Sequence, residues 1–275
     1  MYLVQKKRIP LIHYSSSNMK IIIAGYGFVG KAVHNALKSK HEIVIVDPQY
    51  TTNEIQYHHD ADGLIICVNT PTTEDGICDI KNIANILDQV PIFMPVLIKS
   101  TITPGIPAAL EELYENLAIT YSPEFLRAST ANQDFLNQKF CVLGGEDPEG
   151  LWQDVLSQVL TECKIYFHCT PVEACTIKYA INSFLATKVT FFNQLSDLCD
   201  ANGADFSIVR QIITHDARIG NSHTVVPGLD GLRGFGGACF PKDTEAFLRY
   251  IGTLDTEFDL LETAIKYNKK VRKSS

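Results

Sequence analysis

The sequence lacks the features that mark a nucleic-acid binder or a membrane protein. Acidic residues outnumber basic ones, 31 to 24, which gives a formal net charge of −7. This charge argues against a nucleic-acid partner, because such proteins usually carry a basic patch. No apolar run approaches the ~18 residues that a membrane-spanning helix needs, and the apolar stretch near the start is too short for a signal peptide. We therefore expect a cytoplasmic protein with no membrane partner.

The cysteines show neither a disulfide framework nor a metal-binding pattern. None of the eight belongs to a Cys-x-x-Cys pair, and none has zinc-type spacing to histidine. Cys67 and Cys141 lie in apolar runs, which is typical of reduced core residues in a cytosolic protein. Two adjacent histidines precede an aspartate at 58–60, but nothing else supports a metal site there, and a solvated loop is the favoured interpretation. We predict no bound metal.

A dinucleotide-binding fingerprint follows the first predicted strand. The apolar run 21–24 predicts a buried parallel strand. The next six residues have the spacing Gly-x-Gly-x-x-Gly: Gly25, Tyr26, Gly27, Phe28, Val29 and Gly30. A helix at 31–37 and a strand at 42–46, ending at Asp47, complete the context that this motif requires. We expect the turn to hold a pyrophosphate and Asp47 to bind ribose hydroxyls. Its charge would repel a 2′-phosphate, so NAD is favoured over NADP.

Strands and helices continue to alternate up to about residue 170. The pattern predicts strands at 64–68, 96–99, 118–121, 140–143 and 164–167 and helices at 79–87, capped by Asp79, at 106–116 and at 148–160. Such alternation predicts an α/β fold with a doubly wound parallel sheet, here an NAD-binding Rossmann domain over 19–170. Thr70, Thr101 and Glu124 each follow a predicted strand. Because ligands bind at the carboxyl ends of such strands, we expect these three to line one crevice. Residues 1–18 are expected to be a disordered extension.

The second part of the chain is helical. Apolar residues recur at helical spacing over 171–198, which predicts a helix long enough to be a dimer or interdomain spine. Lys178 and Asn182 stand four apart on one face of it. Judged alone, they are most simply a solvated polar stripe. We assign 171–275 to a helical dimerisation and catalytic domain.

A glycine-rich segment at 234–243 carries one cysteine just before a predicted helix. Cys239 is followed by Pro241 and Lys242, and a thiol at a helix N-terminus beside a cation is placed to act as a nucleophile. An isolated cysteine is more often an inert small hydrophobe. The rest of the sequence must decide between the two.

Seven motifs in order decide it. They are the glycine fingerprint, Asn69-Thr70-Pro71, Lys99-Ser100-Thr101, Ser122-Pro123-Glu124-Phe125-Leu126-Arg127, Lys178 with Asn182, Arg218-Ile219-Gly220 and the segment around Cys239. This set resembles the UDP-glucose/GDP-mannose dehydrogenase family, the nucleotide-sugar 6-dehydrogenases, from about residue 19 to 265. The resemblance implies that the helical domain is similar to that of 6-phosphogluconate dehydrogenase. It makes Cys239 a candidate nucleophile.

The resemblance implies an NAD-dependent, four-electron oxidation of a sugar alcohol to a uronic acid, with UDP-glucose as the commonest family substrate. Cys239 would carry a thioester, and Lys178 with Asn182 would stabilise the oxyanion. Asp243 would orient a water or Lys178, and Glu124 would be the general base, with Thr101 placing the water. Thr70 and Thr101 would also contact the cofactor. Expected substrate contacts are Phe125, Leu126, Arg127, Lys178, Asn182, Arg218 (across a homodimer formed through the helix at 171–200), Phe235, Gly236 and Gly237.

Two departures from the family pattern leave alternatives open. Ala128 stands where relatives commonly carry a second acid, which puts the efficiency of hydrolysis in doubt. Relatives continue into a second Rossmann-like domain that helps to hold the nucleotide. The sequence therefore fits a minimal enzyme with an open nucleotide site, a site completed by another chain, or a non-catalytic remnant that binds NAD or a nucleotide sugar. A two-electron dehydrogenase of the β-hydroxyacid type is a further alternative, but it needs no Cys239.

Overall fold

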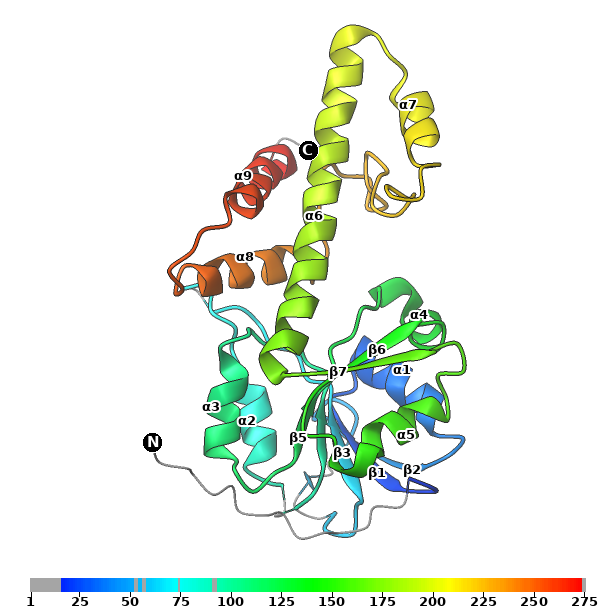
Figure 1. Ribbon diagram of the computed structural model, residues 1–275, viewed down its shortest axis with the longest axis vertical. Coiled ribbons are helices and arrows are strands. Elements are labelled where there is room, and N and C mark those ends of the chain that lie inside the picture. Colours follow the sequence, from blue (N-terminus) through cyan, green and yellow to red (C-terminus); the bar gives the residue numbers. More distant parts are fainter. Residues whose placement is uncertain (1–15, 52–53, 56–57, 74, 91–92, 274–275) are drawn as a thin grey trace. The chain divides into compact units, whose positions relative to one another are not determined.

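Seven strands form one sheet in the computed structural model, which describes residues 16–51, 54–55, 58–73, 75–90 and 93–273. Their order is β2-β1-β3-β4-β5-β6-β7 (Figure 1). The strands are β1 (Lys20–Ala24), β2 (Glu42–Val46), β3 (Gly63–Ile66), β4 (Val96–Ile98), β5 (Ile119–Tyr121), β6 (Phe140–Gly145) and β7 (Ile165–Cys169). Neighbouring strands are parallel except β5 and β6. The predicted α/β fold is confirmed, and the one antiparallel pair is an addition that simple alternation did not indicate.

Helices cover both faces of this sheet, because its central strands present apolar side chains on both sides. In β1, Ile21 and Ile23 belong to one buried cluster and Ile22 and Ala24 to the other, as the alternation of a strand requires. The helices of this part are α1 (Phe28–Leu37), α2 (Lys81–Leu87), α3 (Ile106–Leu113), α4 (Ala131–Leu136), α5 (Leu151–Ser157) and the start of α6 (Pro171–Asn202). Helices α1, α4 and α5 pack on the first cluster, and α2, α3 and the start of α6 on the second (Figure 1).

Two predicted helix starts are wrong by a few residues. Asp79 accepts a hydrogen bond from the amide of Lys81 at 2.9 Å, but the N-cap of α2 is Ile80. The Asp79 side chain therefore forms a local turn ahead of the helix. The helix predicted from residue 148 begins with a 3₁₀ turn, and α5 starts only at Leu151 because Gly150 has a φ of 75°. A left-handed residue cannot continue a right-handed helix.

Helix α6 begins with a capping box. The amide of Glu173 donates to the Thr170 hydroxyl at 3.3 Å, and the Glu173 carboxylate accepts from the Thr170 amide at 2.7 Å. The helix then runs for 32 residues, four beyond the predicted end at 198. Among the residues that the structure describes, no helix is long and apolar enough to cross a membrane.

The helices after α6 build a second core. They are α7 (Phe206–Ile213), α8 (Phe240–Ile251) and α9 (Asp259–Lys273). Tyr179 of α6 stacks on Phe247 of α8 with ring centroids 5.3 Å apart, and Leu261 and Ile265 of α9 complete the cluster. Phe235, from the glycine-rich segment, is buried in the same cluster. The segment that precedes Cys239 is thus anchored among three helices.

The chain divides into two compact units. The first comprises Met1–Pro71 and Cys78–Lys178, and the second Thr72–Ile77 and Tyr179–Ser275. The sequence places the domain boundary after residue 170, whereas the compact units divide inside α6. Of the expected N-terminal extension, residues 1–15 lie outside the described part of the chain.

Candidate active site

The glycine-rich turn after β1 has the geometry of a nucleotide cradle. Gly25 has a φ of 91°, and a Cβ there would lie 2.8 Å from the Cys67 carbonyl carbon. A Cβ on Gly30 would lie 2.0 Å from the Gly25 oxygen, so both positions require glycine. A Cβ on Gly27 would meet nothing within 4 Å. The turn is therefore packed at its two ends and open at Gly27, which is the N-cap of α1. This open backbone at a helix N-terminus fits a pyrophosphate.

Asp47 lies directly after β2 and is fixed by two backbone donors. Its Oδ2 accepts from the amide of Tyr26 at 2.7 Å, and its Oδ1 accepts from the amide of Gln49 at 2.8 Å. Each carboxylate oxygen can accept a second hydrogen bond, so Asp47 keeps the capacity to bind ribose hydroxyls. Of the other fingerprint residues, Phe28 is partly exposed and Val29 packs on the core.

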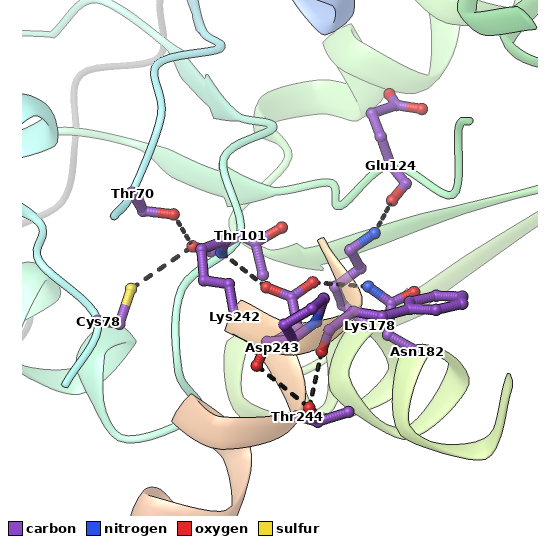
Figure 2. A network of polar contacts seen from close by, with 11 residues as sticks. Thr70, Cys78, Thr101, Glu124, Lys178, Asn182, Lys242, Asp243 and Thr244 are labelled. Atoms are coloured by element: carbon purple, nitrogen blue, oxygen red, sulfur yellow. Dashed lines mark hydrogen bonds and ion pairs between the residues drawn. The ribbon is translucent and has the colours of Figure 1, made fainter. Parts of the chain in front are cut away.

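Thr70 and Thr101 come together as predicted from their places after β3 and β4. The Thr70 hydroxyl donates to the Thr101 carbonyl at 2.6 Å (Figure 2). The thiol of Cys78 lies 3.6 Å from the same carbonyl. This link fixes the backbone at the carboxyl ends of two neighbouring strands.

Glu124 lies in a different setting from the open crevice that we expected. Its carboxylate forms an ion pair with Lys99, and the two side chains are 4% and 1% exposed. Lys99 also donates to the Ser122 hydroxyl at 2.9 Å, and its Nζ lies 5.7 Å from the centre of the Phe135 ring. The carboxylate is therefore turned into the first unit. The reason is that Lys99 and Glu124 follow adjacent strands, with Ile98 opposite Tyr121 in register.

Lys178 contacts Glu124 through the backbone. The Lys178 Nζ donates to the Glu124 carbonyl at 2.5 Å and lies 5.5 Å from the centre of the Phe125 ring. Figure 2 shows the Glu124 carboxylate pointing away from the carbonyl that Lys178 contacts. Lys178 is itself 8% exposed. This ammonium is thus held at a defined position on α6.

The residues after Glu124 were predicted to contact substrate, and the structure gives each of them a partner. Phe125 packs against Phe140 with ring centroids 5.4 Å apart, and Leu126 packs on the core. The Arg127 guanidinium donates two hydrogen bonds to Asp134, at 3.0 and 2.7 Å, and the Arg127 amide donates a third at 3.0 Å. The Arg127 guanidinium lowers the pKa of the Asp134 carboxyl well below its usual range.

The thiol of Cys239 stands at the start of α8. Cys239 is the N-cap residue and is half-buried. Its carbonyl accepts from the amide of Asp243 at 2.8 Å. The residue therefore stands at the positive end of the α8 dipole.

Asp243 is a buried carboxylate in the first turn of α8 that contacts two other side chains. It is 1% exposed. Its Oδ2 accepts from Asn182 Nδ2 at 2.6 Å, and its Oδ1 pairs with Lys242 Nζ at 2.6 Å (Figure 2). Lys242, which we expected beside the thiol as a free cation, is therefore paired with a carboxylate. Asp243 orients the amide of Asn182, the predicted oxyanion donor.

The glycines before Cys239 differ in what surrounds them. A Cβ on Gly236 would lie 2.1 Å from Nη2 of Arg272, whereas a Cβ on Gly237 would meet nothing within 4 Å. The open space predicted for a substrate beside both glycines is thus present at Gly237, but Arg272 fills it at Gly236. The Phe235 side chain is 3% exposed. It packs in the core of the second unit, so it is not available as the substrate contact that the sequence predicted.

Arg218 is an exposed residue of the segment that follows α7. Its side chain is 89% exposed and pairs with Asp216 at 2.5 Å.

Sequence reasoning did not identify Lys99 as the partner of Glu124. It also did not identify the three side chains that contact the backbone of Gly234 and Phe235, which are those of Asn193, Asn268 and Arg272. Lys99 was a motif residue without an assigned partner, and its position after the strand next to that of Glu124 was the signal that could have identified the pair.

The candidate residues fall into two groups, one in each unit. The first unit contributes the glycine turn, Asp47, Thr70, Thr101, Glu124 and Lys178. The second contributes Asn182, Arg218, Cys239 and Asp243. Lys178 and Asn182 lie one turn apart on α6, so this single helix carries a residue of each group.

The fold and the glycine turn define a Rossmann-type nucleotide-binding domain joined to a helical domain that carries a thiol at a helix start. Comparison with known proteins then gives the family. Residues 49–164 match the NAD binding domain, and residues 172–270 the central domain, of the UDP-glucose/GDP-mannose dehydrogenase family. The chain belongs to this family, as the sequence motifs predicted. The first match begins after the glycine turn at 25–30, so that turn is an independent observation.

The chain matches only part of the length of two similar UDP-glucose dehydrogenases. UDP-glucose 6-dehydrogenase of Rickettsia typhi is 34% identical over 218 residues, which cover 76% of this chain and 49% of that protein. A UDP-glucose dehydrogenase structure from the hyperthermophilic archaeon Pyrobaculum islandicum has a TM-score of 0.80 at 27% identity, covering 94% of this chain and 70% of that one. A 3-hydroxyisobutyrate dehydrogenase from Mycobacterium tuberculosis has a TM-score of 0.73 at 17% identity over 92% of this chain and 94% of that one, and shows the shared fold alone. The chain spans about half the length of the curated relative that it matches.

Proposed function

We propose that the protein oxidises the C6 alcohol of a nucleotide sugar to the uronic acid in two NAD-dependent steps, through a thioester on Cys239, and that UDP-glucose is the substrate. The observation that carries the proposal is the start of α8. There a half-buried thiol lies one turn ahead of a buried carboxylate that orients Asn182. A dehydrogenase that removes only two electrons has no need of such a thiol. Its presence therefore favours the four-electron reaction over the β-hydroxyacid type.

The cofactor site supports NAD. The backbone around Gly27 would hold the pyrophosphate, and Asp47 would accept from the ribose hydroxyls. Its carboxylate would repel the 2′-phosphate of NADP. NAD, when bound, supplies the hydride acceptor for each oxidation. The side chains of this chain must then hold the substrate carbon between the two oxidations.

The thiol of Cys239 would hold that carbon. The first oxidation leaves an aldehyde, and the thiolate adds to its carbonyl carbon to form a thiohemiacetal. Loss of the second hydride turns this adduct into a thioester. Water then attacks the acyl carbon, the carbon–sulfur bond breaks, and the acid and the free thiol are released. Lys178 and Asn182 would stabilise the oxyanion that forms at each addition.

Glu124 is proposed as the base for the hydrolytic step, with Thr101 placing the water. In the structure the Glu124 carboxylate is paired with Lys99. To accept a proton from water it must exchange part of this pairing for a water contact. Asp243 is already committed to Asn182 and Lys242, so we assign it the positioning of Asn182.

The number of NADH molecules formed per substrate tests the proposal. Incubating the protein with limiting UDP-glucose and excess NAD is expected to give two NADH and one uronic acid per sugar consumed, because the aldehyde stays on Cys239. Absorbance at the NADH band and mass spectrometry of the product measure the two quantities. GDP-mannose and UDP-N-acetylmannosamine, run in parallel, separate the choice of sugar from the chemistry.

One NADH per substrate with a released aldehyde would contradict the thioester route and favour a two-electron dehydrogenase. NAD binding without turnover on any nucleotide sugar would favour the non-catalytic alternative. Each nucleotide sugar is assayed over a wide range of concentrations, so that weak binding is not mistaken for absence of turnover.

We further propose that the protein forms a homodimer through α6. Phe184, Phe191 and Leu198 recur at seven-residue intervals on this helix and are 68%, 58% and 57% exposed. Ile208 and Ile212 of α7 add two exposed apolar side chains one turn apart. A seven-residue apolar repeat is the pattern by which two helices pair, and a second copy presents the same stripe. Arg218, exposed and beyond α7, is the residue proposed to reach the partner's substrate.

Replacing Phe191 with glutamate is expected to shift the dimer to monomer, raising the dissociation constant at least ~100-fold, because each copy would bury an unpaired carboxylate. Light scattering after size-exclusion chromatography gives the mass. The matched control is Leu113→Glu, which changes an apolar side chain 73% exposed at the end of α3. A wild-type protein that is monomeric at high concentration, or a Phe191→Glu dimer as stable as wild type, would rule out this interface.

A further inference from the structure

Two buried asparagines hold the backbone of the glycine-rich segment ahead of Cys239. Asn193, on α6, is 1% exposed, and its Oδ1 accepts from the amide of Gly234 at 3.0 Å. Asn268, on α9, is 7% exposed, and its Oδ1 accepts from the amide of Phe235 at 2.7 Å. The Nδ2 of Asn268 donates back to the Phe235 carbonyl at 3.0 Å. Three polar groups of the main chain, the two amides and the Phe235 carbonyl, are thereby paired with side chains from two helices.

These hydrogen bonds take the place of those that a neighbouring β-strand would supply to the same backbone groups. Gly234 and Phe235 are buried but belong to no helix or strand, and buried peptide groups need hydrogen-bond partners. A carboxamide presents an acceptor and a donor on the same side, as an extended residue of a strand does with its own N–H and C=O. Asn268 therefore pairs with Phe235 in the way an adjacent strand would.

The glycine beside this pair is matched to the asparagine. A Cβ on Gly234 would lie 2.3 Å from Asn268 Oδ1, and Gly234 has a φ of 73°. Only a residue without a side chain admits the carboxamide at this distance. Gly234 and Asn268 thus form a complementary pair across 34 positions of sequence, and both belong to the second unit.

Arg272, one turn after Asn268 on α9, also contacts the Phe235 backbone. Its Nε donates to the Phe235 carbonyl at 3.1 Å, and its Nη2 donates to Asp230 at 2.7 Å. The absence of a side chain at Gly236 gives the guanidinium its place. The carbonyl of Phe235 therefore receives donors from both Asn268 and Arg272. Beyond this point Gly237 is open, and only Ala238 separates it from Cys239.

We propose that Asn268 is a positioning residue that sets the place of the Cys239 thiol by fixing the backbone of Phe235. The chain from Phe235 to Cys239 is anchored at one end by Asn268 and at the other by the start of α8. The two glycines between them supply no restraint of their own. Without the Asn268 bonds, the segment 236–238 gains freedom and the thiol moves relative to the groups of α8. This inference rests on the proposed function for its catalytic consequence.

The test replaces Asn268 with leucine, which has a similar size but neither hydrogen bond, and with aspartate, which keeps only the acceptor for the Phe235 amide. In Asn268→Leu, kcat is expected to fall about 100-fold, the cost of misplacing a reacting group by roughly 1 Å. In Asn268→Asp, kcat is expected to fall by a smaller factor, because the acceptor for the Phe235 amide remains. Two readouts need no substrate: hydrogen exchange of the amides at 236–238, expected to speed up at least ~10-fold, and the rate at which iodoacetamide alkylates Cys239, expected to change at least ~3-fold.

The control separates positioning from stability. Leu261→Ala weakens the packing of α9 at a side chain 1% exposed but leaves the bonds to Phe235 in place. The two variants are compared under conditions where both have lost the same amount of melting temperature. Faster hydrogen exchange and altered alkylation are then expected in Asn268→Leu and not in Leu261→Ala. Equal changes in both variants would overturn it. If the wild type oxidises no nucleotide sugar, the proposed function fails, while exchange and alkylation still decide the role of Asn268.

Discussion

Replacing Cys239 with alanine is expected to lower formation of the uronic acid by at least about four orders of magnitude, the scale on which loss of a covalent nucleophile acts. The other nucleophilic side chain at the start of α8, that of Lys242, is engaged with Asp243 and does not replace the thiol. Binding of NAD is expected to be unchanged, because the glycine turn at Gly27 belongs to the first unit. Product analysis and titration calorimetry with NAD measure the two properties.

The matched control for this variant is Cys169→Ala. Cys169 and Cys239 are the two half-buried cysteines of the described chain, and the other cysteines there are buried. Burial raises the pKa of the Cys169 thiol, which keeps it protonated and unreactive near neutral pH. Cys169→Ala is therefore expected to keep full activity. Acid formation in Cys239→Ala at the wild-type rate would remove the thioester from the mechanism.

The fold was predictable because its signals are local. The strand β1, the turn from Gly25 to Gly30 and the acid at Asp47 follow one another within 30 residues, and each step has its own sequence signature. The long helix α6 was equally evident from its apolar spacing. The antiparallel pairing of β5 with β6 was not, because strand–helix alternation predicts parallel neighbours throughout the sheet.

The sequence motifs predicted which residues belong to the candidate site. They did not predict which other side chains these residues contact. Motifs identified Glu124 and Asp243, whereas the structure shows what each of them contacts. Asp243 bonds Asn182 across 61 positions, and Asn268 bonds Phe235 across 33. Contacts of this range depend on how helices pack, which spacing within the sequence does not encode. Lys99 is the exception, because register between adjacent strands brings it to Glu124.

The buried pair of Lys99 and Glu124 leads to the prediction with the largest effect on stability. Burial acts to lower the pKa of Lys99, but the Glu124 carboxylate and the neighbouring cysteines act against it, and the net result is a raised pKa. A lysine whose pKa is raised by folding contributes stability at every pH below its unfolded pKa of about 10.4. This stability is lost as the pH rises above that value and through the folded-state pKa. At neutral pH the Lys99 ammonium therefore keeps its charge beside the Glu124 carboxylate.

Lys99→Met is expected to destabilise the protein by about 3–5 kcal/mol at pH 7.5, because it leaves the Glu124 carboxylate buried without a counter-ion. A buried carboxylate without a counter-ion favours protonation, so the loss of stability relative to the wild type should be smaller near pH 5 than near pH 8. Chemical denaturation at the two pH values measures it. The exposed pair Lys139–Glu162, with side chains 70% and 56% exposed, provides the control, and Lys139→Met is expected to cost under about 1 kcal/mol.

The double variant Lys99→Met/Glu124→Leu decides the cause of the loss. Removing both charges removes the unpaired carboxylate, so most of the stability should return, as replacement of a buried ion pair by apolar groups is often neutral. A double variant as unstable as Lys99→Met would mean that the packing of Lys99 against Phe135, and not its charge, is what the fold requires. If the double variant folds well but no longer releases acid from Cys239, the carboxylate acts in hydrolysis. Full acid release would leave Glu124 with only its carbonyl contact to Lys178.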